Sequence, residues 1–183
     1  MMFKNFINLK KFENKVTFGF FTSQGGVSTG DYSSLNCNKN SKDKKNNITK
    51  NIIIALRNLE LENKNLKLIN QVHSNRVFDI NYNNYRKKLY GDGLITKEKN
   101  IALAVLTADC APIFLFDDQK TIICCLHAGW KGALKNIIKK CIDNLNKKNL
   151  QISNINAIIG PCLGYRNFEV DKNLKYKFIK ENE

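Results

Sequence analysis

Short apolar runs separated by polar and turn-forming residues occupy most of the chain. Runs of this length are typical of β-strands, and those without polar interruption are typical of strands buried on both faces. The runs that predict strands are 16–21, 66–73, 76–80, 101–107, 113–117, 121–126 and 155–159. Asp118, Gln119 and Lys120 separate two of these runs, which predicts a hairpin.

Apolar residues at helical spacing predict helices in three places. The first helix has the apolar positions Ile48, Ile52, Leu56 and Leu59, with Asn47 as its N-cap. The clearest helix follows Gly129, and we predict one continuous helix with the apolar face Trp130, Leu134, Ile137, Ile138, Cys141, Ile142 and Leu145. A last helix is predicted to begin near Asp171.

The order of these elements indicates the fold class. Strands occur both in hairpins and in alternation with helices. This favours an α+β domain with a mixed sheet and outer helices over a doubly wound parallel sheet. Segment 22–38 is rich in Gly and Ser and predicts a loop, 38–47 predicts a polar surface loop, and Gly91-Asp92-Gly93 predicts a turn.

Length and composition limit the classes of protein. A chain of 183 residues is expected to form a single domain over 1–183. No apolar run approaches the roughly 20 residues of a membrane helix, and the N-terminal sequence lacks the apolar core of a secretory signal. We therefore expect a cytoplasmic protein with no membrane partner.

The chain is strongly basic, with a net charge of +14. Only Arg57, Arg76, Arg86 and Arg166 are arginines, and the lysines are dispersed along the chain. Because base and phosphate recognition favours the planar fork of arginine, we interpret the charge as a solvated surface and expect no specific nucleic-acid partner.

The cysteines show no metal-finger or disulfide pattern. They are Cys37, Cys110, Cys124, Cys125, Cys141 and Cys162. No CxxC pair occurs among them. Three lie within apolar runs and are expected in the core, whereas Cys110 and Cys162 lie beside Pro and Gly where apolar runs begin or end.

One cysteine and both histidines of the chain are placed where they could meet. His73 and His127 end strand-like runs, and Cys110 follows a third. Three such ligands around an open fourth position are typical of catalytic zinc, although copper accepts the same donors. Two alternatives remain open from the residues alone. In the first, all three residues are purely structural. In the second, Cys110 is a nucleophile and His127 is its base.

Other residues near these motifs suggest an anion site and proton transfer. Gly129 precedes a helix whose free N–H groups would attract phosphate, and Lys131 adds a positive charge. Asp92, Asp109 and Glu169 are candidate general acids or bases, and the sequence does not separate them.

Six motifs together resemble the YfiH family, formerly called multicopper polyphenol oxidoreductase laccase. They are TSQGGVSTGDYSSLN (22–36), NQVHSNRV (70–77), GDGLIT (91–96), LTADCAPIFLF (106–116), CLHAGWKG (125–132) and IGPCLGYRNFEV (159–170). The resemblance implies mixed sheets in an α/β/β/α arrangement and zinc on His73, Cys110 and His127. It also implies purine nucleoside phosphorylase activity on adenosine, inosine, guanosine and methylthioadenosine, together with adenosine deaminase activity. A homodimer is compatible with it.

The chain departs from the family pattern at several points. Gln24 and Lys131 stand where the family has arginine, which weakens the anion contact expected from Gln24 and keeps only the charge at Lys131. Arg166 is the other cation assigned to phosphate, and Asp109 is assigned a catalytic role beside the ligands. The family pattern also continues beyond the equivalent of Val170, so the chain is expected to be a form shortened at its C-terminus.

Three other functions compete with this one. A copper polyphenol oxidase resembling laccase would need several copper sites, and two histidines are too few to build them. A metal-free cysteine hydrolase would use Cys110 and His127. A basic RNA-binding protein would need aromatic and basic residues interleaved on a sheet, and that motif is missing.

Overall fold

The structure is a computed structural model that describes residues 6–7, 16–119, 121–147 and 154–181. The chain divides into two compact units, Met1–Asn65 and Leu66–Glu183. The elements are β1 (Phe6–Ile7), β2 (Phe20–Phe21), η2 (Gly30–Tyr32), α1 (Lys45–Asn58), β3 (Asn65–Leu68), β4 (Val77–Ile80), β5 (Gly93–Thr96), β6 (Ile101–Ala104), β7 (Ala111–Asp117), β8 (Ile123–Ala128), α2 (Trp130–Leu134), α3 (Ile137–Asn146), β9 (Ile155–Ile159), η4 (Tyr165–Asn167) and α4 (Lys172–Glu181). The single domain over 1–183 stays a prediction.

In the first unit, a long loop packs on α1 through the buried side chain of Asn51. Its Oδ1 accepts the backbone N–H of Val27 at 2.8 Å, and its Nδ2 donates to Ser28 Oγ at 2.8 Å and to the Asn36 carbonyl at 2.9 Å. The predicted loop 22–38 is therefore held by a polar residue of the helix. A Cβ on Gly26 would collide with the Ser34 carbonyl oxygen, so only glycine fits where the loop crosses itself.

Two predictions for the first unit are wrong in detail. Lys44, not Asn47, is the N-cap of α1. Asp43 accepts the N–H of Lys44 at 2.7 Å and the Ser28 hydroxyl at 2.6 Å, and these bonds hold the chain extended up to Lys44. Of the strand predicted at 16–21, only the last two residues form a strand, β2, which pairs with β1 in antiparallel orientation.

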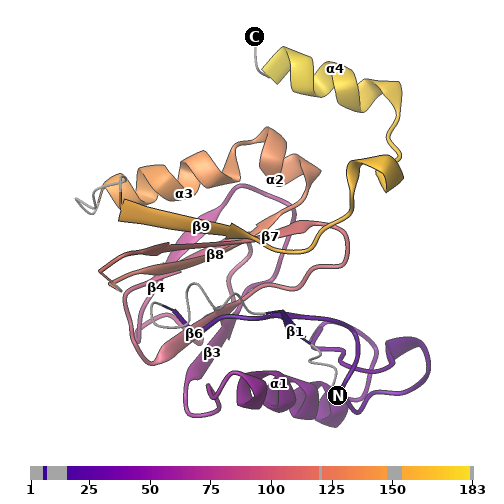
Figure 1. Cartoon of the computed structure of the whole chain (residues 1–183), viewed down its shortest axis with the longest axis vertical. Helices are drawn as coiled ribbons and strands as arrows, with labels where there is room; N and C mark the ends of the chain where they lie inside the picture. The colour runs from indigo at the N-terminus through magenta and orange to yellow at the C-terminus, as the bar shows by residue number, and fades with distance from the viewer. Residues whose placement is uncertain (1–5, 8–15, 120, 148–153, 182–183) are drawn as a thin grey trace. The chain divides into compact units, whose positions relative to one another are not determined.

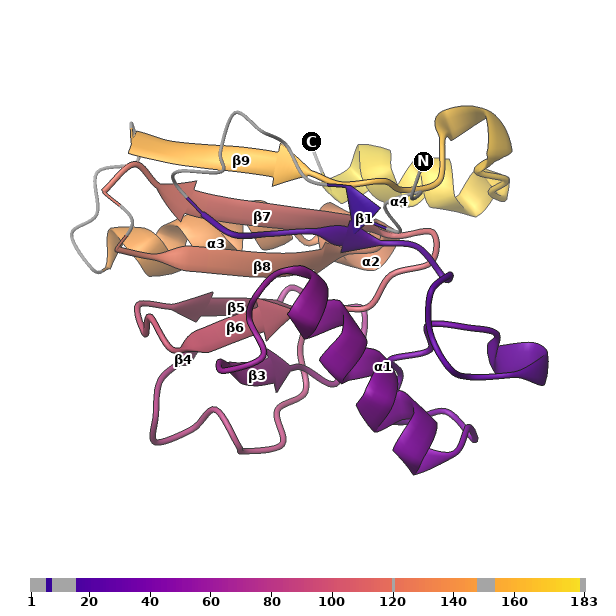
Figure 2. The same ribbon diagram turned by 60° about the horizontal axis from the view of Figure 1, so that its bottom comes forward.

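The second unit is built on a mixed sheet in the order β4-β5-β8-β7-β9. β4 and β5 are parallel, and the remaining neighbours are antiparallel. Figure 2 shows β9, β7, β8 and β5 in this order. The predicted hairpin is present as β7 and β8, although Lys120 of its turn lies outside the described residues. The apolar pattern does not predict β5, because GLIT is short and its first residue, Gly93, is also the last residue of the Gly-Asp-Gly turn.

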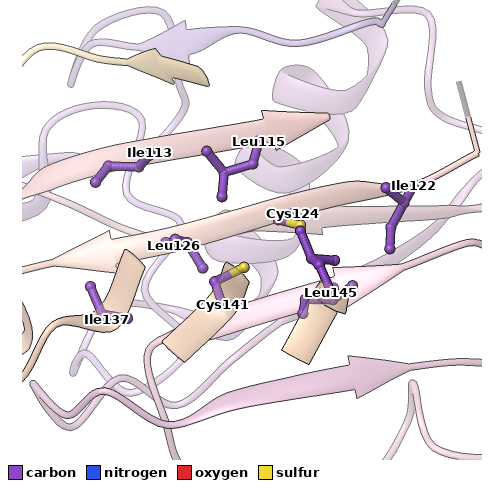
Figure 3. Close-up of a cluster of buried hydrophobic side chains, with 9 residues drawn as sticks. Ile113, Leu115, Ile122, Cys124, Leu126, Ile137, Cys141 and Leu145 are labelled. Carbon is purple, nitrogen blue, oxygen red and sulfur yellow. The ribbon is translucent and has the colours of Figure 1, made fainter. Parts of the chain in front are cut away.

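Helices α2 and α3 cover one face of this sheet (Figure 1). Leu126 on β8 packs here with Cys141 and Leu145 on α3, and all three are fully buried (Figure 3). The prediction of one continuous helix is wrong, because Asn136 adopts a left-handed conformation, with φ 53°, between α2 and α3. The break turns Ile138 outward, and 43% of it is exposed.

A second hydrophobic cluster covers the other face. Leu94, next to Ile95 on β5, points away from the helices and packs with Ile80 and Ile101. β6 pairs with β3 in a separate two-stranded sheet, so the second unit has the layers helix, sheet, sheet. The expected α+β class with mixed sheets is confirmed.

Several strands end earlier than their apolar runs, and the remaining residues form loops. β3 ends at Leu68 rather than at residue 73, and β6 ends at Ala104 rather than at residue 107. His73 and Cys110 therefore lie on loops, where side chains can converge. The last predicted helix is present as α4, and Asp171 Oδ1 accepts the N–H of Leu174 at its start. Among the described helices, none is long and apolar enough to cross a membrane.

Candidate metal centre

His73, Cys110 and His127 lie together in the second unit. One potential ligand atom from each side chain lies within 4.8 Å of the other two. The hairpin explains part of this proximity. Pro112 near the start of β7 is paired with His127 near the end of β8, which places Cys110 at the same end of the sheet. His73 joins them from the loop between β3 and β4.

Asp92 orients the ring of His127. The Nδ1 atom of His127 lies 2.8 Å from Oδ1 of Asp92, and the backbone N–H of His127 donates to the Asp92 carbonyl at 2.7 Å. Both side chains are buried, with 3% and 0% exposed. Because Nδ1 is engaged, Nε2 is the atom that remains for a metal. A carboxylate on the second nitrogen of a ligating histidine is the usual arrangement around zinc.

The same carboxylate also holds the loop that carries His73. It accepts the backbone N–H groups of His73 at 3.0 Å and Ser74 at 2.5 Å, and the Ser74 hydroxyl at 2.7 Å. His73 has a φ of 54°, a conformation that non-glycine residues rarely adopt. Burial raises the pKa of Asp92, but the bonds from His127, Ser74 and His73 outweigh it and lower the pKa to about 2.

Gln71 ties the His73 loop to the segment that leads to Cys110. Its Nε2 donates to the Leu106 carbonyl at 2.7 Å, and its Oε1 accepts the N–H of Leu106 at 2.7 Å. A side-chain amide that satisfies both backbone groups of one residue acts as a short piece of β-ladder. Gln71 is not among the residues that the sequence pattern points to, since a glutamine beside an apolar run carries no periodic signal.

Gly129 is needed for space rather than for backbone freedom. Its φ of −75° is open to any residue. A Cβ at this position would lie 2.9 Å from Cδ2 of His73 and 3.0 Å from Sγ of Cys110. The glycine of the His-Ala-Gly motif therefore lies directly against two of the three candidate ligands.

The cluster fits a soft or borderline metal ion. Burial, followed by the charges of Asp109 and Asp92, raises the pKa of the Cys110 thiol. A divalent cation would supply the positive charge that favours a thiolate here. Within the described parts of the chain, this is the single group of at least three His, Cys, Asp or Glu residues close enough to hold a metal.

The side chains assigned to phosphate and proton transfer, those of Lys131, Arg166, Gln24 and Asp109, are exposed, whereas Gly129 is buried. Lys131 lies in the first turn of α2, with its Nζ 5.4 Å from the centre of the Trp130 ring. Arg166 lies in η4 and donates from Nε to the Tyr165 hydroxyl at 3.0 Å. Because α2 has only five residues, the helix dipole at Gly129 is small.

Asp109 belongs to the same unit as the cluster, whereas Gln24 belongs to the other unit. Asp109 is exposed and adjoins Cys110, and its backbone carbonyl accepts the N–H of Leu163, which links it to the segment that contains Arg166. Glu169 is also exposed. Gln24 belongs to the first unit and lies on its exposed loop. The assignment of Lys131, Arg166, Gln24 and Gly129 to phosphate stays a prediction.

Solved structures have the same fold. The chain superposes on the YfiH protein of Bacillus licheniformis with a TM-score of 0.81 and 27% identity, over 87% of this chain and 63% of the other. YlmD of Geobacillus stearothermophilus gives a TM-score of 0.80 and 26% identity, over 87% and 62% of the two chains.

Sequence relatives extend the comparison. Purine nucleoside phosphorylase YlmD of Bacillus subtilis is 32% identical over 182 residues, which are 93% of this chain and 65% of the relative. A purine nucleoside phosphorylase of Campylobacter jejuni is 43% identical over 105 residues, which are 56% of this chain and 45% of the relative. The chain thus spans less than two thirds of the length of these relatives.

The sequence profile of one family, described as multi-copper polyphenol oxidoreductase laccase, matches residues 17–183. This range contains all three candidate ligands as well as Asp92 and Gly129. With the agreement in fold and in sequence, the match shows that the chain belongs to this family, the YfiH family.

Proposed function

We propose that the protein is a zinc-dependent purine nucleoside phosphorylase that also deaminates adenosine. The substrates would be adenosine, inosine, guanosine or methylthioadenosine together with phosphate. The products of phosphorolysis would be the free base and ribose 1-phosphate. Relatives that carry the name purine nucleoside phosphorylase support the reaction class.

The observation that carries the proposal is the His73–Cys110–His127 cluster with Asp92 behind it. One thiolate and two imidazoles are the donors that zinc prefers, and three protein ligands leave a position open for substrate. A zinc ion in such a site polarises bound oxygen groups and lowers the pKa of water. This chemistry is suited to the hydrolytic loss of an amino group from adenosine.

Phosphorolysis needs further groups that bind the anion. Phosphate must be held against C1′ of the ribose while the bond to the purine breaks. Lys131 can offer its ammonium group to phosphate oxygens, and the guanidinium fork of Arg166 matches a phosphate edge. Both side chains are exposed, so neither is committed to a buried partner.

A carboxylate that moves protons must be reachable and must exchange its proton. Asp92 is unsuited to this role, since it is fully buried and its carboxylate accepts bonds from His127 and Ser74. Asp109 is exposed beside Cys110, so we assign proton transfer to Asp109.

The alternatives have weaker support. For a cysteine hydrolase, Cys110 would have to be a thiolate nucleophile, and its environment raises the pKa of the thiol instead. For a polyphenol oxidase with several coppers, the described residues offer one three-ligand group, and the whole chain has two histidines.

One experiment tests the proposal. The metal content of the purified protein is measured by mass spectrometry. The protein is then incubated with adenosine or inosine, in the presence and in the absence of phosphate. We expect about one zinc per chain, phosphate-dependent release of hypoxanthine from inosine, and phosphate-independent formation of inosine from adenosine. Full activity in metal-free protein after chelation would favour the cysteine nucleophile. A metal-loaded protein that converts neither nucleoside would contradict the proposed function.

A further inference from the structure

Asp92 is a fully buried carboxylate whose side-chain partners include the imidazole of His127. A buried carboxylate without compensation is costly, so each of its oxygens should be paired. Oδ1 pairs with His127 Nδ1 at 2.8 Å and with the backbone N–H of His73 at 3.0 Å. Oδ2 pairs with the backbone N–H and the hydroxyl of Ser74 at 2.5 and 2.7 Å.

These bonds connect two ligands that are distant in the sequence. One set fixes the ring of His127 on β8, and the other fixes the backbone of the loop that carries His73. The two imidazole rings meet edge to face, with their centres 4.8 Å apart and their planes at 80°. A shift of the Asp92 side chain would therefore change the position of both rings relative to Cys110.

We propose that Asp92 is a positioning residue that sets both histidine ligands at once. It holds His127 as the tautomer with a proton on Nδ1, so that Nε2 presents its lone pair to the cluster. It also clamps residues 72–74, so that His73 keeps its left-handed conformation. The inference rests on the proposed metal centre. The hydrogen bond between Asp92 and His127, however, is present without a metal.

The first test uses the metal-free full-length chain. Long-range proton–nitrogen spectra distinguish a protonated ring nitrogen from an unprotonated one, and the chain has only two histidines to assign. We expect His127 of the metal-free protein to carry its proton on Nδ1, the ring nitrogen that faces the Asp92 carboxylate at 2.8 Å. A proton on Nε2 would overturn the proposal, even if every variant of Asp92 failed to fold.

The second test uses the D92N variant. Both oxygens of Asp92 face hydrogen-bond donors, so an amide must place its own NH₂ group against one of them. Zinc affinity is measured by competition with a coloured chelator, and the cobalt complex is followed by its absorption spectrum. We expect D92N to bind zinc roughly 10- to 100-fold more weakly and to give a changed cobalt spectrum.

Matched variants separate positioning from folding. Asp143 is an exposed carboxylate on α3 that pairs with Lys139, so D143N should leave zinc affinity unchanged. S74A removes one donor to Oδ2 and should have a smaller effect than D92N. An unchanged affinity and cobalt spectrum in folded D92N would overturn the proposal, since a purely structural role lowers only the melting temperature. A wild-type protein that binds no metal would refute the metal centre, while the tautomer would still decide the role of Asp92.

Discussion

Gly129 lies so close to Cys110 that a Cβ atom on the glycine would stand 3.0 Å from the thiol sulfur. The same Cβ would stand 2.9 Å from the ring of His73. The backbone of Gly129 thus forms one wall of the candidate metal centre, and its missing side chain leaves the room in which two ligands converge. This steric role differs from the anion-binding role that the sequence suggested for the same residue.

Replacement of Gly129 by alanine should therefore disturb the ligands. The backbone angles suit alanine, so the effect of G129A should come from crowding alone. We expect zinc affinity to fall by at least about tenfold, and the free energy of unfolding of the metal-free protein to fall by about 1–3 kcal/mol. Chelator competition and urea denaturation measure the two effects.

Gly164 provides the control for this substitution. It has an ordinary φ of −73°, and a Cβ there would meet no atom within 4 Å. G164A should leave zinc affinity unchanged. Equal affinities in wild type, G129A and G164A would show that the site tolerates a methyl group and that the proposed packing is wrong.

Loss of the thiolate should abolish metal binding. We expect C110A to contain only background zinc, because two imidazoles without the thiolate hold the ion far more weakly. Cys162 is an exposed free cysteine on a neighbouring segment and is not part of the cluster, so C162A should retain the full metal content. Elemental analysis of the purified variants decides the matter, and a C110A protein with stoichiometric zinc would refute the ligand assignment.

Lys131 and Arg166 should matter for phosphorolysis more than for deamination. A charged hydrogen bond contributes about 1.5–3 kcal/mol, so K131A and R166A should raise the apparent KM for phosphate roughly 10- to 100-fold. Deamination of adenosine uses no phosphate and should change little. Lys135 is exposed at the end of α2, and K135A is the matched control. Equal losses in both reactions, in folded protein, would contradict a separate anion site.

Asn51 should stabilise the loop of the first unit. Leucine at this position has a similar size but pairs neither with the N–H of Val27 nor with the carbonyl of Asn36. We expect N51L to lower the free energy of unfolding by about 1–3 kcal/mol in urea denaturation. Asn58 is exposed on the same helix, and N58L should change stability little. Comparable stability in N51L and N58L would argue against a structural role for the buried amide.

Periodicity in the sequence located most elements, because strands and helices bury their apolar residues at fixed spacings. It predicted the β7–β8 hairpin, β9 and the beginning of α4. It failed where tertiary contacts outweigh local preference. Asn136 breaks the predicted helix although the apolar spacing continues through it, and β5 is too short to stand out from the turn before it.

The candidate ligands could be named from the sequence, because cysteines and histidines at the ends of apolar runs are few and chemically distinctive. Their convergence depends on the tertiary structure. The β7–β8 register brings Cys110 to His127, and the clamp of Gln71 on Leu106 brings the His73 loop to the same place. Neither relation is local in the chain.

The sequence by itself named the residues that could bind a metal. Only the tertiary structure decided the role of each carboxylate. Asp92, Asp109 and Glu169 are equivalent as residue types, but burial and five donors hold Asp92 behind the histidines, while Asp109 and Glu169 remain in solvent. The physical reason is that burial and hydrogen bonds set the behaviour of a carboxylate, and both arise only when distant segments pack together.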